Sequence, residues 1–272
     1  MCKSKNATEK SIEKLLFLDT LLPDGLAGNE LIILASRPQM GKSSFAFSVA
    51  YNAVSSGIPV GFVSLEYPAS QIILRATSMQ SKQKPQNIKE EELNKLISEI
   101  NSLPLFIDDT SSLSIKELKE KCQRWKAEKN VGLIIVDYLQ LIKSPEAESR
   151  TRSQEIEIIM AVLKEIAREL EVPVLAFAQL NQAITGEKIP TLLDFQESAS
   201  IASTADIVMF LRRPEYYLKD VENRDEILEQ NNWKDLANFI VAKNSVGQTG
   251  TIDLTCNMEF GTFENRNKVV TA

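Results

Sequence analysis

Residues 31–54 read LIILASRPQMGKSSFAFSVAYNAV. The run over 31–36 is apolar or small and ends in a polar loop, which predicts a buried strand. The apolar spacing over 43–54 predicts a helix directly after that loop. A strand that leads through a glycine-containing loop into a helix is the setting that phosphate-binding loops require. This segment therefore predicts an α/β fold built around a phosphate site.

The loop matches the pattern G-x-x-x-x-G-K-[ST] except at its first position, where Ser36 replaces glycine. Gly41 lets backbone N–H groups turn toward phosphates, Lys42 supplies a cation for the β- and γ-phosphates, and Ser43 supplies a hydroxyl for Mg²⁺. The N-terminus of the following helix adds positive potential. The alternative is a chance Gly-Lys-Ser in a strand-to-helix turn. We expect the contacting residues to be Arg37, Pro38, Gln39, Met40, Gly41, Lys42, Ser43 and Ser44.

Strands and helices are expected to alternate along most of the chain, which indicates a parallel sheet covered on both faces. The expected strands are 31–36, 58–64, 104–109, 131–137, 173–179 and 206–211, and the expected helices are 43–54, 69–80, 90–102, 114–129 and 154–170. Ser114 and Glu117 form a capping box. The segments 237–243 and 249–256 predict an antiparallel hairpin. The acidic segment 214–235 has no strong period and is interpreted as a surface insertion.

Three polar side chains stand at the ends of expected strands, where open α/β sheets bind ligands. Asp137 is placed to hold Mg²⁺, although a lone Asp there can also cap the next helix. Glu66 is placed to orient and deprotonate a water, or is a surface carboxylate. Gln179 is placed to sense a γ-phosphate, or is a hydrogen-bonded strand-end amide. Together with the loop, Asp137 weighs against a chance match.

Composition narrows the chemistry and the partners. The 272 residues include no histidine, so a proton acceptor must be a carboxylate or, less often, Lys, Tyr or Cys. The net charge of −6 argues against whole-surface attraction to nucleic acid and leaves a local patch or a channel lined by several subunits. The three cysteines lack metal-site spacing, which fits a reducing, cytoplasmic compartment. No apolar run reaches membrane-spanning length, so no membrane partner is expected.

Longer strings resemble the C-terminal ATPase domain of DnaB-like replicative helicases, a branch of the RecA-like ATPases. They are ILASRPQMGKSSFAF at 33–47, LIIVDYLQL at 133–141, VPVLAFAQLN at 172–181 and ESASIASTADIVMFLRRPEYY at 197–217. The resemblance covers nearly the whole chain. It implies an α/β fold of the RecA-like P-loop NTPase type, with a mostly parallel sheet, helices on both faces and a C-terminal hairpin. The domain would span 29–272, after a tail or linker helix at 1–28.

The resemblance also implies roles for residues. The catalytic group would be Glu66, Lys42, Gln179 and Lys243. Arg75 and Arg213 would join the loop in binding ATP, and Ser43 with Asp137 would hold Mg²⁺. Partners would be single-stranded DNA, further copies of the chain in a ring-shaped hexamer, and other replication proteins. For Arg213 a charged strand exit is the alternative, and Tyr216 and Tyr217 either stack on a base or pack structurally.

Two departures from the family pattern bear on activity. Residues 242–247 read AKNSVG where the family reads A-K-Q-R-N-G, so Lys243 is kept but Ser245 replaces an arginine finger. Such a finger is worth about 10³–10⁵ in rate. Gln196, Glu197, Ser198 and Ala199 stand where the family's DNA loop reads R-E-S-G, so one cation is missing.

The sequence leaves three functional readings. The first is an ATP-hydrolysing, helicase-type motor that binds single-stranded DNA. The second is a degenerate relative that binds nucleotide, hydrolyses it weakly and serves as a scaffold or regulator. The third is a RecA-like recombinase or clock-type ATPase, against which the DYLQL and ESASI strings argue. The family's N-terminal helical domain has no counterpart in the residues before the phosphate loop.

Overall fold

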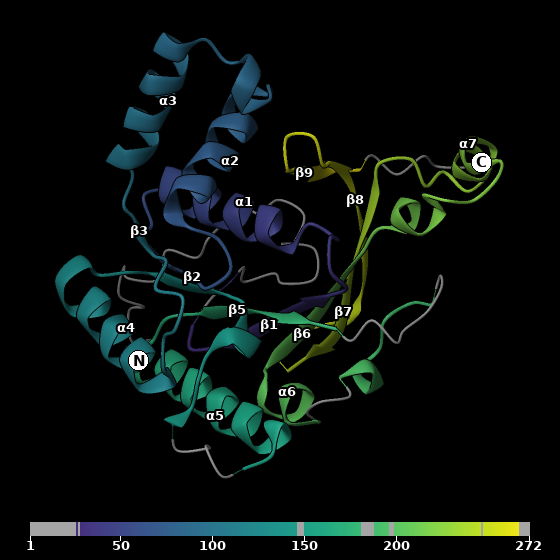
Figure 1. The fold of residues 1–272 in the computed structure, drawn as a ribbon. Helices are drawn as coiled ribbons and strands as arrows, with labels where there is room; N and C mark the ends of the chain where they lie inside the picture. The colour runs from purple at the N-terminus through teal and green to yellow at the C-terminus, as the bar shows by residue number, and fades with distance from the viewer. Residues whose placement is uncertain are drawn as a thin grey trace, which may run out of the picture.

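The protein is described by a computed structural model that covers residues 26, 28–145, 150–180, 188–195, 199–245 and 247–266. Within these ranges one sheet of nine strands has the order β3-β2-β4-β5-β1-β6-β7-β8-β9 (Figure 1). The strands are β1 Leu31–Ser36, β2 Val60–Ser64, β3 Leu105–Asp108, β4 Leu133–Asp137, β5 Val174–Gln179, β6 Ile207–Arg212, β7 Leu236–Asn244, β8 Gly250–Asn257 and β9 Thr262–Asn265.

Helices cover both faces of the sheet, with α1 to α3 on one side and α4 to α6 on the other (Figure 1). They are α1 Lys42–Ser55, α2 Ala69–Ser81, α3 Glu90–Ser102, α4 Ile115–Lys129, α5 Arg152–Leu170, α6 Ala199–Thr204 and α7 Arg224–Gln230. Short 3₁₀ turns lie at Pro85–Asn87, Leu139–Leu141, Leu192–Asp194 and Pro214–Leu218. None of the helices described is both long and apolar enough to cross a membrane.

Strand β1 is buried on both faces because it lies in the middle of the sheet between β5 and β6. Successive side chains of a strand point to opposite faces. Ile32 and Leu34 accordingly join the core around α1, whereas Leu31, Ile33 and Ala35 join the core under α4 and α5. This two-sided burial explains why β1 is a continuous apolar run without polar alternation.

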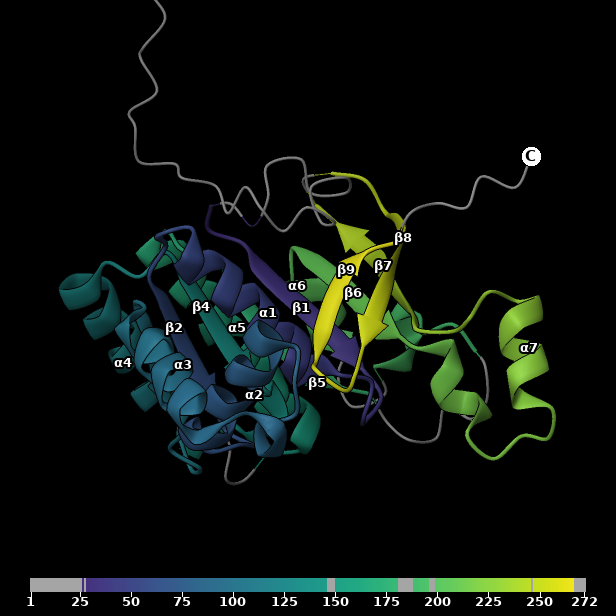
Figure 2. The ribbon, with the colours of Figure 1, turned by 90° about the horizontal axis from the view of Figure 1, so that it is seen from above.

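The six strands from β3 to β6 are parallel, whereas β7, β8 and β9 each pair antiparallel with the strand before them. The predicted hairpin is confirmed, because β7 and β8 pair antiparallel from Leu236 with Thr255 to Val241 with Gly250. Figure 2 shows α7 beyond the β7–β8 end of the sheet, outside the layered core. The predicted α/β class is therefore confirmed, with the antiparallel strands confined to one end.

Most predicted elements are confirmed to within about two residues. The capping box at the start of α4 is present, since Ser114 and Glu117 each bond the other's backbone N–H. Strand β9 was not predicted, because its four residues at 262–265 carry no clear apolar alternation. The segment 214–235 also contains a 3₁₀ turn and α7, so describing it only as an aperiodic insertion was incomplete.

Candidate functional site

The predicted polar residues converge on one edge of the sheet. The parallel strands β2, β4, β5, β1 and β6 are neighbours in that order, so their carboxyl ends share an edge. At this edge Ser64 of β2 lies opposite Asp137 of β4, and Gln179 of β5 lies opposite Ser36 of β1. Glu66 follows two residues after β2 ends. The fold thus brings together side chains that are more than a hundred residues apart in sequence.

The phosphate loop between β1 and α1 has the backbone that a cradle for phosphate needs. Gln39 and Gly41 have φ angles of 63° and 96°, in the left-handed region. A side chain is strained at such an angle, which explains the glycine at 41. Gly41 stands at the N-cap of α1 and has no side chain with which to cap the helix. The N-terminus of α1 therefore suits an anion, because its first backbone N–H groups have no partner within the helix.

Lys42 is the cation at the centre of this site. It is the first residue of α1 and only 8% exposed. Burial lowers the pKa of Lys42, while the nearby carboxylates of Asp137 and Glu66 act in the opposite direction. Placing a cation in a buried position between two carboxylates concentrates charge where a phosphate chain would lie.

The surroundings of Asp137 show whether the site suits Mg²⁺. It is 1% exposed, and its Oδ1 is buried without a hydrogen-bond partner among the described residues. Burial raises the pKa of Asp137 and Glu66 raises it further, whereas a hydrogen bond with Ser43 and the cations Lys42 and Arg75 lower it. An orphaned buried carboxylate oxygen beside a serine hydroxyl is the donor set that a hard divalent cation prefers. The residues present therefore fit Mg²⁺.

Glu66 and Arg75 flank Asp137 on the β2 side. Glu66 is exposed to solvent, and its charge reaches both Lys42 and Asp137. Arg75 lies on α2, with its guanidinium carbon 4.1 Å from the centre of the Tyr67 ring. The aromatic face orients the guanidinium at this edge of the sheet. Both residues therefore lie near Asp137, and their roles toward nucleotide remain predictions.

Two tyrosines also contact the phosphate loop, which sequence reasoning left open. They belong to the 3₁₀ turn Pro214–Leu218 that follows β6. The hydroxyl of Tyr216 is 3.1 Å from Oε1 of Gln39, and the guanidinium carbon of Arg37 is 5.2 Å from the Tyr217 ring centre. The Tyr-Tyr pair after a strand end was the available signal, and it indicates loop packing in this structure.

Arg212 and Arg213 are directed differently. Arg213 lies beside the Cys256 thiol, whose pKa is raised by burial and lowered by Arg213. Cys256 belongs to the core that packs on α1. Arg212, which is 8% exposed, instead donates to Oδ1 of Asn238 at 3.2 Å. The assignment of Arg213 to the nucleotide therefore remains a prediction.

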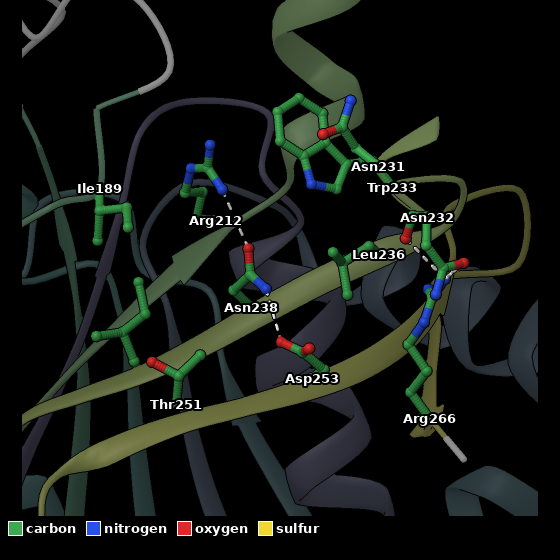
Figure 3. A pocket seen from close by; sticks show the side chains of 11 residues that line it. Ile189, Arg212, Asn231, Asn232, Trp233, Leu236, Asn238, Thr251, Asp253 and Arg266 are labelled. Atoms are coloured by element: carbon green, nitrogen blue, oxygen red, sulfur yellow. Dashed lines mark hydrogen bonds between the residues drawn. The ribbon is translucent and has the colours of Figure 1, made fainter. Parts of the chain in front are cut away.

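Arg212 lies in a recess of about 340 Å³ over β6 to β8 (Figure 3). A row of hydrogen bonds crosses the three strands, because Nδ2 of Asn238 in turn donates to Oδ1 of Asp253 at 2.7 Å. Trp233 stands beside the row, 5.9 Å from the guanidinium carbon of Arg212. Since the row pairs a cation with a carboxylate through an amide, it holds Arg212 at the end of β6.

The hairpin tip lies at the opposite edge of the sheet from the phosphate loop. Asn244, near the tip, pairs with Ile207, the first residue of β6, and β6 is parallel to β1. Nζ of Lys243 donates to the carbonyl oxygens of Ala202, Ser203 and Ala205, at the end of α6. Lys243 is therefore remote from Lys42 of its own subunit, and its assignment to a catalytic site remains a prediction.

The predicted DNA loop is partly outside the described residues. Gln196, Glu197 and Ser198 lie outside them, and Ala199 is the exposed first residue of α6. The tail 1–28 falls outside them as well, apart from Leu26 and Gly28. These assignments remain predictions.

Comparisons with known proteins agree with this arrangement. The family profile described as DnaB-like helicase C terminal domain matches residues 14–265. The chain is 38% identical to the replicative DNA helicase DnaC of Bacillus subtilis (strain 168), over 89% of this chain and 53% of the relative. It is 37% identical to the replicative DNA helicase DnaB of Geobacillus stearothermophilus, over 90% of this chain and 54% of the relative. The chain thus spans about half the length of these curated relatives.

A solved structure carries the same fold. A DnaB-like replicative helicase, described with its interactions with primase, superposes with a TM-score of 0.83 and 30% identity, over 97% of this chain and 65% of that chain. On the profile match, which spans most of its length, this chain belongs to the family of the DnaB-like helicase C-terminal domain.

Proposed function

We propose that this domain binds and hydrolyses ATP at the contacts between its subunits and uses the reaction to move along single-stranded DNA during replication. The observation that carries the proposal is the cluster of Lys42, Ser43 and Asp137 at the carboxyl edge of the sheet. The charges of Lys42 and Asp137 interact with each other. Oδ1 of Asp137 is buried without a hydrogen-bond partner among the described residues. Charge of this kind in a buried position suits a phosphate chain with a divalent cation.

Each residue has a task in the cleavage of the β–γ phosphate linkage. Lys42 and the N-terminus of α1 neutralise charge on the phosphates. Asp137 and Ser43 would hold Mg²⁺, which would supply positive charge to offset the negative charge that develops on the phosphates. Glu66 accepts a proton from the attacking water as the new oxygen–phosphorus bond forms and the bond to the leaving ADP oxygen breaks. No histidine is present in the sequence to compete for that role.

Gln179 and Arg75 respond to the same phosphate chain. Gln179 ends β5 beside the loop residue Ser36, and its amide suits a neutral sensor of the γ-phosphate. Arg75 is held over Tyr67 and adds a planar cation at the β2 side. Both residues therefore add to catalysis through orientation and charge rather than through proton transfer.

The site is completed by a neighbouring subunit. The hairpin tip with Lys243 and Ser245 lies at the edge of the sheet opposite to the phosphate loop. In the proposed head-to-tail ring this tip would meet the phosphate loop of the next copy. A ring of six such subunits encloses a central channel, and the segment 196–199 faces single-stranded DNA there. The proposal also includes contacts with other replication proteins and a location in the cytoplasm.

The test is the ATPase rate as a function of protein concentration, with and without single-stranded DNA. A working motor gives a rate per subunit that rises steeply with concentration and increases further with DNA, because the site needs a second copy. A flat and very low rate with clear ATP binding contradicts the motor and supports the degenerate scaffold, with Ser245 as its first cause. Lys42→Ala serves as the zero-activity control.

A further inference from the structure

The side chain of Gln140 is hydrogen-bonded twice to the main chain of Gln179. Nε2 of Gln140 donates to the carbonyl oxygen of Gln179 at 2.9 Å, and the backbone N–H of Gln179 donates to Oε1 of Gln140 at 3.1 Å. One primary amide thus satisfies both backbone groups of a single residue. It imitates the two hydrogen bonds that a neighbouring strand would make.

Gln179 bonds a side chain instead of a neighbouring strand because β4 ends before it reaches Gln179. The ladder between β4 and β5 ends where Val136 pairs with Ala176, and β4 itself ends at Asp137. On the other side of β5, the backbone N–H of Leu180 donates to Ser36 of β1. Alternate residues of a strand direct their backbone groups to alternate sides, so Gln179 directs its own toward β4, which has already turned away. Gln140 fills that position.

Gln140 is itself anchored. It lies in the 3₁₀ turn Leu139–Leu141, and Leu139 is fully buried. The carbonyl oxygen of Gln140 accepts a hydrogen bond of 2.6 Å from Nη2 of Arg152, in the first turn of α5. Arg152 also pairs with Glu155 of the same helix. The main chain of Gln140 is therefore fixed by Arg152, and its side chain makes a fixed link from this turn to Gln179.

We propose that Gln140 is a positioning residue that couples Asp137, the proposed Mg²⁺ ligand, to Gln179, the proposed sensor of the γ-phosphate. Gln140 lies in the 3₁₀ turn that begins two residues after Asp137 ends β4, and it fixes the main chain of Gln179 through its side chain. A movement of either strand end is transmitted to the other through this amide. The proposal rests on the proposed function, because it requires that Gln179 respond to nucleotide.

The chemistry of an amide is essential here. A carboxylate presents two acceptors, so an ionised glutamate side chain in place of Gln140 would accept from the Gln179 N–H but repel its carbonyl oxygen. A protonated carboxyl group restores one donor and one acceptor. Leucine preserves volume but offers neither. Gln140→Leu removes both hydrogen bonds to Gln179, and Gln140→Glu disrupts the same pair while the carboxyl group is ionised. Only the loss in Gln140→Glu can be reversed by lowering the pH.

The experiment measures kcat and KM for ATP, together with affinity for ADP and for ADP with aluminium fluoride as a transition-state mimic. Gln140→Leu is expected to lower kcat about tenfold, since one poorly satisfied backbone pair displaces Gln179. Affinity for the mimic falls in parallel, whereas KM and ADP affinity change less than about twofold, as is typical of a contact used only in the transition state. An unchanged kcat and mimic affinity overturn the proposal.

Gln140→Glu covers the case in which the leucine variant does not fold. Its kcat relative to the parent protein is expected to rise as pH falls toward the ordinary carboxyl range, because protonation restores the donor. A ratio that is constant with pH contradicts the proposal. Thermal unfolding of both variants, measured alongside, identifies any loss caused by misfolding.

Gln179→Ala separates this proposal from the proposed function. If Gln179→Ala keeps its kcat, the sensor role fails and the coupling falls with it. If Gln179→Ala loses activity while Gln140→Leu does not, only the coupling fails. If both lose activity, the double variant is expected to be little worse than Gln179→Ala, because both act through one group. Additive losses would mean that Gln140 acts elsewhere.

Discussion

The ammonium group of Lys243 donates a hydrogen bond of 2.6 Å to the carbonyl oxygen of Ala205 in its own subunit. The same group also bonds the carbonyls of Ala202 and Ser203, so one hairpin lysine satisfies the end of α6. The last carbonyls of a helix have no intrahelical partner and favour a cation. The hairpin therefore fastens α6, whose first residue, Ala199, is the last residue of the predicted DNA segment 196–199.

Lys243→Met is expected to loosen α6, because it removes the cation and keeps most of the aliphatic stem. Amide hydrogen exchange over 199–204 should accelerate about tenfold or more, while exchange in α1 stays unchanged. Lys116→Met, which removes an exposed cation from α4, is the matched control. Unchanged exchange in α6 would show that the hairpin does not hold this helix.

Glu66→Gln is expected to separate binding from turnover. The amide keeps the size of Glu66 but accepts no proton, so kcat should fall by about 10²–10⁴ while ATP affinity stays within a few-fold. Single-turnover kinetics with a fluorescent ATP analogue measures both quantities.

Lys42→Ala is the counterpart, because loss of the buried cation should abolish binding itself. Retained ATP binding in Lys42→Ala would refute the phosphate-loop assignment, and unchanged turnover in Glu66→Gln would remove Glu66 from the mechanism.

Asp137→Asn is expected to raise stability and to abolish Mg²⁺-dependent hydrolysis. Burial raises the pKa of Asp137, so its ionised form destabilises the ligand-free folded state at neutral pH. Folding then binds a proton between the ordinary and the raised pKa, and the free energy of unfolding falls as pH rises through that window. Each kcal/mol regained in the variant should raise Tm by about 2–4 °C.

The advantage of Asp137→Asn over the parent protein should be largest at neutral pH and shrink as pH falls toward the ordinary carboxyl range. Thermal unfolding without nucleotide or Mg²⁺, from neutral to mildly acidic pH, measures it. A difference in Tm that is constant with pH would show that the carboxylate titrates outside this window. A lower Tm at neutral pH would show that its contacts with Ser43 and Lys42 outweigh desolvation.

Ser245→Arg is expected to raise the ATPase rate of the assembled protein. Ser245 is exposed at the hairpin tip. Its backbone N–H donates a hydrogen bond of 3.0 Å to the carbonyl oxygen of Asp206, which fixes the position of the main chain that carries the side chain. An arginine finger is worth about 10³–10⁵ in well-studied NTPases, and a grafted one should recover at least about tenfold. Ser245→Lys is the control for charge without the bidentate fork. If neither variant changes the rate at high protein concentration, the hairpin does not reach a neighbour.

The sequence predicts the sheet well because its central strands are buried on both faces. Such strands are apolar runs with polar residues at their ends, so the run 31–36 and the end residues Asp137 and Gln179 could be located directly. Strand β9 and helix α7 are short and depend on tertiary contacts, so local pattern carries little information about them.

Contacts between distant side chains were harder to predict. Gln140 stands out only as one amide among apolar neighbours in YLQL, and its partner is 39 residues away. Lys243 was recognised as a cation, but its hydrogen-bond partners depend on how β7 and α6 meet. A pattern along one strand does not specify the register of the next strand.

The separation of the phosphate loop and the hairpin tip to opposite edges of the sheet has a consequence for symmetry. A contact in which the tip of one copy meets the loop of the next joins two different surface patches, and it can repeat from copy to copy in one direction. An assembly in which each tip meets the next loop is therefore heterologous, with one polarity running through all subunits. Whether it closes into a ring or continues as a helical filament depends on the rotation between neighbours, and a small change in that rotation converts one into the other.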